Sequence, residues 1–292
     1  MRTIRIHSGA VQSLVGIENS LIASSSRDRK INVWSIESLP IPLIQQKLEL
    51  KPSVKFLGLA LLSGHRLASS CEDGSINVWN LSDGSLIQNL NGHLNQTRAL
   101  AVLPDGDTLA SGSKDTTINI WNSTSGQLLN TFKGHSSEVY SLCFLKNSGL
   151  LASGSANEIF IWNVEQKILL KQLRSNFGVV WSLVELDINR LASAHGSHDR
   201  TIKIWDFNNG TVVNTLRGHT DWVKSLTVLS NGLNQLASGS FDRSIKIWNF
   251  NTGQLINTLH GHLDQVYSLI YLEKGSKLIS GSRDSVIKIW NL

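Results

Sequence analysis

Serine, histidine and aspartate recur together along this 292-residue sequence at a regular spacing. Together they form the nucleophile, the general base and the orienting acid of a hydrolase triad, so one such group could carry out acyl transfer. In one stretch the group consists of His219, Ser238 and Asp242. The same residue types return elsewhere in the chain, and several copies of one catalytic site in a single chain would be unusual. The repetition favours a structural role for the group over a catalytic one.

The group also contains a tryptophan, which divides the sequence into seven units. The tryptophans that mark units one to seven are spaced 41 to 45 residues apart: Trp34, Trp79, Trp121, Trp162, Trp205, Trp248 and Trp290. Five units carry a histidine, a serine and an acid or amide ahead of the tryptophan. These sets are His7, Ser24, Asp28 and Trp34; His93, Ser111, Asp115 and Trp121; His135, Ser153, Asn157 and Trp162; His219, Ser238, Asp242 and Trp248; His262, Ser280, Asp284 and Trp290. The second and fifth units have Pro52 and Asn176 in the histidine position, so we expect them to be less stable.

Each unit shows four short stretches with the alternation and residue types of β-strands. In the fourth unit these are residues 139–145, residues 150–155, a third strand ending at Trp162, and residues 168–173. Glycine and asparagine turns separate the strands, and helical periodicity is absent. A repeat of this length that fills the chain indicates an all-β repeat architecture. The sequence ends in a third strand, while residues 2–6 form a strand with no neighbour in sequence. The pairing of residues 2–6 with residues 286–292 would leave no open sheet edge between the two ends.

The recurring pattern of Gly-His, then Ser-Gly-Ser-x-Asp, then Ile-Lys-Ile-Trp resembles the WD-repeat (WD40) β-propeller family over residues 1–292. The resemblance implies one domain, a seven-bladed β-propeller of four-stranded antiparallel blades around a central channel. Only Trp205 is followed by the aspartate that gives the repeat its name. In the family, the acid of each blade accepts a hydrogen bond from the histidine, the histidine contacts the serine, and the serine accepts one from the indole. The resemblance implies these roles for the five sets above, with Asn157 replacing the acid in the fourth unit.

The composition excludes several other classes of protein. A hydrophobic content of 41% is enough for a core, and the net charge of +5 is mild. Cys71 and Cys143 have neither metal-ligand nor redox-pair spacing, which is typical of a reducing compartment. The N-terminus lacks the apolar region of a signal peptide, and no apolar run approaches the length of a membrane span. We therefore expect an intracellular protein, cytoplasmic or nuclear, that does not enter a membrane.

One cluster has the composition of a metal site. His195, His198 and Asp199 lie together in an enlarged turn of the fifth unit, and two histidines with a carboxylate could bind a metal. A surface loop with unrelated histidines is the favoured interpretation. No glycine-rich phosphate loop is present. We expect no catalytic residue, cofactor or metal.

The resemblance also predicts a binding face. In propellers, the loops that join outer to inner strands and second to third strands emerge around one mouth of the channel. Alignment of the seven units selects the following residues for this face: Arg27, Lys55, Arg98, Lys114, Tyr140, Trp181, His198, Trp222, Lys224, Phe241, Tyr267 and Arg283. The opposite face is predicted to be more acidic, with Glu18, Asp83, Asp105, Asp107, Asp187 and Glu273.

Arginine beside exposed tryptophan and tyrosine is the composition of interface hot spots. A basic, aromatic mouth fits an acidic or phosphorylated peptide, so we interpret the chain as a non-enzymatic, monomeric scaffold for protein or peptide partners. Nucleic acid is the alternative ligand for the same face. The absence of a long basic stripe favours the peptide. A recognition domain within a larger chain is a further alternative.

Overall fold

The computed structural model describes residues 1–17, 21–36, 46–50, 55–230 and 232–292. Within these ranges the chain forms 27 β-strands and no helix, so the predicted all-β class is confirmed. No described helix has the length and hydropathy that a membrane span requires. Pro52 and Glu18, which entered the predictions above, lie outside the described residues.

The described strands form antiparallel sheets that follow the sequence units. Three four-stranded sheets precede the middle of the chain: β2 (Val11–Ile17), β3 (Leu21–Ser26), β4 (Ile31–Ser35) and β5 (Gln46–Leu50); β6 (Phe56–Leu62), β7 (Arg66–Cys71), β8 (Ile76–Asn80) and β9 (Leu86–Leu90); β10 (Thr97–Val102), β11 (Thr108–Ser113), β12 (Ile118–Asn122) and β13 (Leu128–Phe132). Two more follow it: β21 (Val223–Leu229), β22 (Gln235–Ser240), β23 (Ile245–Asn249) and β24 (Leu255–Leu259); β25 (Val266–Leu272), β26 (Lys277–Ser282), β27 (Ile287–Asn291) and β1 (Arg2–Ile4).

The fourth and fifth units share one seven-stranded sheet. Its strands are β14 (Ser141–Leu145), β15 (Leu150–Gly154), β16 (Ala156–Asn163), β17 (Ile168–Glu185), β18 (Arg190–His195), β19 (Ile202–Asp206) and β20 (Thr211–Leu216). The long strand β17 joins the two units because its first part pairs with β16 and its last part pairs with β18. The outer strand predicted for the fourth unit therefore continues without a break into the inner strand of the fifth.

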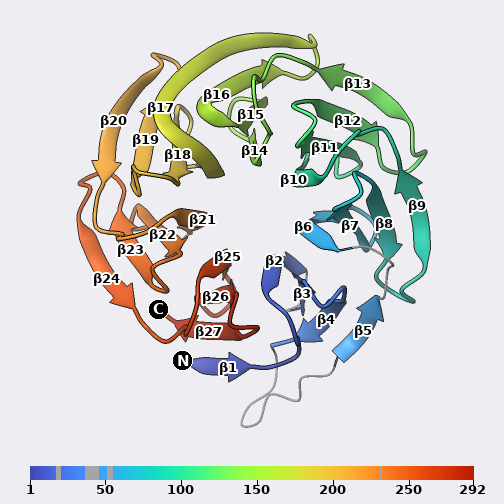
Figure 1. Ribbon diagram of the computed structural model, residues 1–292, viewed down its shortest axis with the longest axis horizontal. Coiled ribbons are helices and arrows are strands. Elements are labelled where there is room, and N and C mark those ends of the chain that lie inside the picture. The colour runs from blue at the N-terminus through green and yellow to red at the C-terminus, as the bar shows by residue number, and fades with distance from the viewer. Residues whose placement is uncertain (18–20, 37–45, 51–54, 231) are drawn as a thin grey trace.

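The sheets are arranged around a central opening, with β2, β6, β10, β14, β21 and β25 nearest to it (Figure 1). Apart from β1, the strands of each sheet follow one another as an up-and-down meander, so all inner strands begin at one mouth of the opening. The turns between first and second strands, and between third and fourth strands, lie at the other mouth. We call the first of these the entry face and the second the opposite face.

The two ends of the chain meet in the last sheet. β1 pairs with β27 through Arg2 and Ile289, Thr3 and Lys288, and Ile4 and Ile287, so the pairing predicted for the N-terminal strand is present, although β1 ends at Ile4. Figure 1 shows the N-terminal strand beside the C-terminal one.

The core lies between neighbouring sheets, and the repeated tryptophan packs against the sheet of the preceding unit. Trp121 contacts the cluster that includes Ile76 and Val78 of the second unit. Trp34 in the first unit packs in the same way with Ile279 and Ile287 of the last. At roughly 25 cal/mol per Å², about 200 Å² of buried indole stabilises each contact by up to about 5 kcal/mol. The first and last sheets are therefore held together by packing, and β1, which pairs within the last sheet, leads along the chain into the first.

Candidate functional site

The repeated polar residues form buried chains of hydrogen bonds. In the five complete sets, the histidine Nδ1 lies 2.6 to 3.0 Å from a carboxylate oxygen. The histidine Nε2 lies 2.6 to 2.8 Å from the serine Oγ. The indole donates to the same Oγ at 2.8 to 3.2 Å. An ionised carboxylate can only accept, so Nδ1–H donates to it and the serine hydroxyl donates to Nε2.

Burial favours the neutral form of His93 and His135 and keeps the serines away from any substrate. Burial lowers the pKa of His93 and of His135, although the neighbouring carboxylate opposes the shift. Ser111 and Ser153 have no exposed surface, and each hydroxyl already accepts from an indole. The sets therefore stabilise the strands of each unit, as their repetition suggested, and their hydroxyls are not accessible nucleophiles.

The fourth unit corrects one prediction, because Glu158 and not Asn157 is the partner of His135. Glu158 Oε1 lies 2.9 Å from His135 Nδ1 and accepts the Ser136 N–H at 3.0 Å. The serine and tryptophan of this unit are nine residues apart, against ten in the first unit. Asn157 has a φ of 63°, and Arg29 and Thr116, at the same distance before their tryptophans, also have a positive φ. The Asn157 side chain accepts from the Gly178 N–H at 2.8 Å. The longer glutamate side chain replaces the aspartate of the other units.

The fifth unit corrects a second prediction, because His195 does not lie in a surface loop. It is fully buried, and the Ser193 hydroxyl lies 2.7 Å from its Nε2. The Trp205 indole donates to the same hydroxyl at 2.7 Å. His195 therefore takes the place of the missing first histidine from within the second strand, and burial lowers its pKa to about 4.

The acid of the fifth unit has a lysine as its partner. Asp199 Oδ2 lies 3.2 Å from the ammonium of Lys203, which lies 4.0 Å from the centre of the Phe177 ring. His198 is exposed and lines a separate cavity with Phe177 and Asp199. His195 and His198 therefore point to different surroundings, and the described residues contain no group of three His, Cys, Asp or Glu side chains that could bind a metal.

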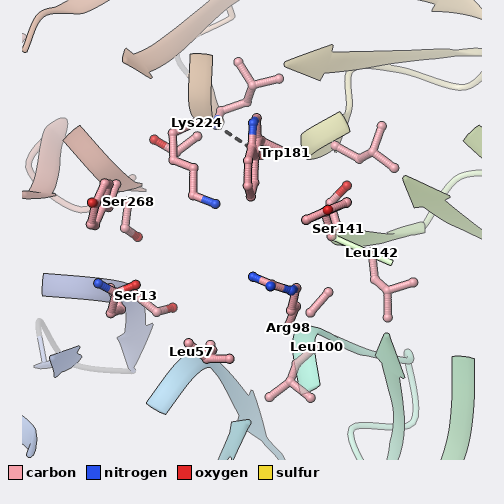
Figure 2. A pocket seen from close by; sticks show the side chains of 18 of the residues that line it. Ser13, Leu57, Arg98, Leu100, Ser141, Leu142, Trp181, Lys224 and Ser268 are labelled. Atoms are coloured by element: carbon pink, nitrogen blue, oxygen red, sulfur yellow. Dashed lines mark hydrogen bonds between the residues drawn. The ribbon is translucent and has the colours of Figure 1, made fainter. Parts of the chain in front are cut away.

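The first residues of the inner strands converge on a cavity of about 270 Å³ in the central opening. From each unit in turn, the residues at its rim are Gln12, Leu57, Arg98, Tyr140, Trp181, Lys224 and Tyr267. In six of the inner strands, the pairing with the second strand skips this residue. A skipped residue is a β-bulge, which re-aims its side chain. Five of the proposed face residues therefore line the same cavity, and Figure 2 shows Arg98, Trp181 and Lys224 among them.

A serine follows the rim residue in five units, and all of these serines except Ser225 hydrogen-bond to a neighbouring unit. These serines are Ser13, Ser141, Ser182, Ser225 and Ser268. The Leu59 N–H donates to Ser13 Oγ at 3.2 Å, and the Leu14 N–H donates to Ser268 Oγ at 3.0 Å. This serine layer was not predicted, although a Ser-Leu pair recurs at these positions in the sequence.

The charges at the rim are unevenly compensated. Glu138 lies 2.9 Å from Arg98 Nε and 3.4 Å from Lys114 Nζ. Arg98 also lies over the Tyr140 ring, with Cζ 5.3 Å from its centre. Burial raises the pKa of Tyr140, and Glu138 adds to the effect. One carboxylate thus serves two cations, and its role was not predicted.

Lys224 contacts an aromatic ring instead of an acid. Its Nζ lies 3.6 Å from the centre of a Trp181 ring, a cation–π contact. Burial lowers the pKa of Lys224 to about 7, and the positive charge of Arg98 adds to the effect. The channel therefore holds an amine that titrates near neutral pH.

Five aromatic side chains continue from this point around the entry face in one contiguous arc. The contacts run from Tyr140 to Trp181 at 4.8 Å, Trp181 to Trp222 at 5.9 Å, Trp222 to Phe241 at 5.2 Å and Phe241 to Tyr267 at 5.6 Å between ring centres. The Trp222 ring is nearly parallel to both of its neighbours, at 22° and 23°. The five aromatic residues proposed for the binding face thus form one surface.

The other proposed face residues lie further out. Lys55 pairs with Glu72 at 3.2 Å, and Arg283 lies 3.7 Å from Asp264. Arg27 is exposed. Burial raises the pKa of Tyr267, and the charges of Arg27 and Arg283 partly oppose this shift.

Apart from Glu18, which lies outside the described residues, the acidic residues proposed for the opposite face lie in the turns at the far ends of the strands. Asp105 and Asp107 follow β10, and Glu273 follows β25. Asp105 accepts from the Asp107 and Thr108 N–H groups, and Asp107 pairs with Arg66. Several of these acids therefore hold turns together.

Antiparallel sheets around a channel, with a hydrogen-bonded set of tryptophan, serine, histidine and acid in five of the units, define a β-propeller built from WD repeats. The family model described as WDR41, a β-propeller model, matches residues 44–197. The model described as "WD domain, G-beta repeat" matches residues 1–35, 210–249 and 253–291. The chain belongs to the WD-repeat β-propeller family.

Two particular proteins are similar to it. The Lissencephaly-1 homolog of Caenorhabditis briggsae is 34% identical over 106 residues, which are 36% of this chain and 26% of that protein. The match thus spans about a quarter of the relative's length. The solved structure titled "Crystal structure of WD40 beta propeller domain of Doa1" superposes with a TM-score of 0.85 at 24% identity, covering 99% of this chain and 95% of that one. That likeness concerns the fold.

Proposed function

We propose that the chain is a single-domain, seven-bladed propeller, completed by β1 in its last blade, that acts as a monomeric, non-enzymatic scaffold inside the cell. Its partners are proteins or peptides with acidic or phosphorylated segments, which bind at the entry face. WD-repeat propellers generally act as protein-interaction scaffolds. The observation that carries the proposal is the convergence of Arg98, Lys224 and the aromatic arc on one mouth of the channel.

The composition of the entry face supports this proposal. Tryptophan, tyrosine and arginine dominate binding energy in protein interfaces, and the arc gives them a continuous surface. Acidic or phosphorylated groups bind such cations through charge-assisted hydrogen bonds. The exposed ammonium of Lys114 and guanidinium of Arg283 extend the positive charge outward.

Affinity capture of partners with the intact protein tests the proposal. We expect Trp222→Ala to weaken a captured partner by about 2 kcal/mol, the loss typical of a hot spot. The double variant Lys114→Glu, Arg283→Glu should weaken it as well, with an unchanged melting temperature. The matched control is Glu165→Lys, Glu273→Lys, which reverses two exposed acids on the opposite face. A partner that is lost with the control and kept with the entry-face variants would overturn the proposed face.

Nucleic acid is the second candidate, because flat, neighbouring rings such as Trp181 and Trp222 can stack on bases. The dependence of affinity on salt concentration distinguishes the two classes of ligand. Affinity for single-stranded DNA should fall linearly with the logarithm of salt concentration with a slope near −0.7 for each phosphate contact. An aromatic-anchored peptide should depend on salt less strongly.

A further inference from the structure

The channel cavity is lined by several hydrogen-bond donors, and those of Gln12 and Ser225 lack an acceptor in the described structure. Lys224 reaches into it from β21 and Arg98 from β10, on different sides of the opening, and both point toward its middle (Figure 2). Gln12 lines the same cavity, and its side-chain nitrogen is buried without a hydrogen-bond partner among the described residues. The Ser225 hydroxyl below Lys224 also lacks one in the described structure. Groups of this kind are complementary to an acceptor with several oxygens.

The charges around the cavity also favour an anionic ligand. Glu138 is the acid that lies beside Arg98, and it is shared with Lys114. Within the described ranges, no carboxylate lies within ion-pair distance of Lys224, whose ammonium contacts Trp181. Lys224 is partly buried, and a partly desolvated cation without a counter-ion is costly, so an incoming anion would compensate an unfavourable charge.

We propose that the channel is an anion site in which an acidic group of the bound partner, a carboxylate or a phosphate, enters between Lys224 and Arg98. This rests on the function proposed above and specifies its anchor. The anion would receive hydrogen bonds from the Lys224 ammonium and the Arg98 guanidinium, with Gln12 at the rim and the Trp181 ring as the apolar wall beside it.

Binding at this site should take up a proton. The free protein holds Lys224 with a pKa of about 7, because of burial and then the charge of Arg98. The groups on the surrounding strands do not compete: Trp181 on β17 does not titrate, His195 on β18 is neutral with a pKa of about 4, and burial raises the pKa of Tyr267 on β25. An anion beside Lys224 favours the charged amine and raises its pKa, so affinity must fall as pH rises above 7.

Titration of the intact protein with sodium sulfate tests the site, with tryptophan fluorescence as the signal and sodium chloride keeping the ionic strength constant. Sulfate remains a dianion throughout the range, so any pH dependence belongs to the protein. We expect saturable binding that weakens roughly fivefold to tenfold for each pH unit between pH 7 and pH 9. Sodium acetate is the second probe. Tighter sulfate binding would indicate a phosphate-type anchor, and tighter acetate binding a carboxylate.

Three variants assign the effect to the channel. Lys224→Met keeps an apolar chain against Trp181 and should abolish saturable binding. Lys224→Arg keeps a charge at every pH, so it should bind sulfate with little pH dependence. Lys133→Met, which removes an exposed lysine, is the matched control and should behave like the parent. Circular dichroism and the melting temperature verify that each variant is folded.

Absence of saturable binding by the folded parent to either anion, or equal binding by Lys224→Met, would overturn the anion site. A captured partner that still depends on Trp222 would then leave the proposed function standing. If the anions bind as expected but no partner depends on the entry face, the proposed function fails and the anion site remains.

Discussion

Replacement of Glu158 by alanine should destabilise the protein more than any change to its neighbour Asn157. The substitution removes the acceptor of the His135 Nδ1–H, 2.9 Å away, and that of the Ser136 N–H, 3.0 Å away. His135 is buried, so its N–H cannot form a replacement hydrogen bond with water. A buried donor without an acceptor lowers the free energy of unfolding by about 1–3 kcal/mol. Ser136 is exposed and recovers its bond from solvent. We therefore expect a loss of about 2 to 3 kcal/mol, equivalent to a melting temperature lower by roughly 5 °C.

Asn157→Gly is the matched control for this loss. Asn157 has a φ of 63°, a conformation that glycine adopts without strain, so the variant removes the side chain and keeps the turn. Only the bond to the Gly178 N–H is lost, and we expect a change below about 1 kcal/mol. Glu158→Gln retains a carbonyl oxygen that can accept from His135, so it should lie between the two.

Urea unfolding at pH 7, followed by tryptophan fluorescence, measures all three variants, with Asp242→Ala in the sixth unit as the reference. Asp242 accepts from His219 at 2.6 Å in the same way, so its loss should match that of Glu158→Ala. The assignment would be refuted if Asn157→Gly were as destabilising as Glu158→Ala, or if Glu158→Ala unfolded at the urea concentration of the parent.

Other consequences can be measured in the same way. Gly196→Ala would place a Cβ too close to the Trp181 indole nitrogen, so the ring must move. We therefore expect altered tryptophan fluorescence and weaker sulfate binding. Fluorescence and sulfate affinity equal to those of the parent would contradict this. Removal of residues 1–6 deletes the partner of β27 and the buried Ile4, so the melting temperature should fall by several degrees. An unchanged melting temperature would show that this pairing does not stabilise the protein. Burial alone would raise the pKa of the aspartates in the buried sets, but the hydrogen bonds that they accept lower it below the unfolded value of 3.8. Their contribution is present above the unfolded pKa and is lost progressively as the pH falls from there toward the lower folded pKa, so thermal scans should show stability falling below about pH 4, with a shallower slope in Asp242→Asn.

Sequence alone determined the repeat, the strand class and most of the buried hydrogen-bond sets. Each set lies within one unit, and the spacing of His219, Ser238 and Trp248 is tied to strands of fixed length joined by tight turns. The prediction for the fourth unit was wrong because its turn is one residue shorter, which moves the acid by one position relative to the serine. Counting residues cannot tell whether Asn157 or Glu158 then faces His135. The same limit applied to His195, which was assigned to a loop but extends the second strand.

Only the tertiary structure decided how the entry face works. Alignment selected Arg98, Trp181 and Lys224 as neighbours, but their direction depends on the β-bulge at the start of each inner strand. A bulge changes the direction of one side chain without any change in its residue type. The contact of Lys224 with Trp181 and its distance from any carboxylate arise between units 43 residues apart in sequence. Charge compensation acts through space, so the packing of whole sheets around the channel determines which cation remains unpaired.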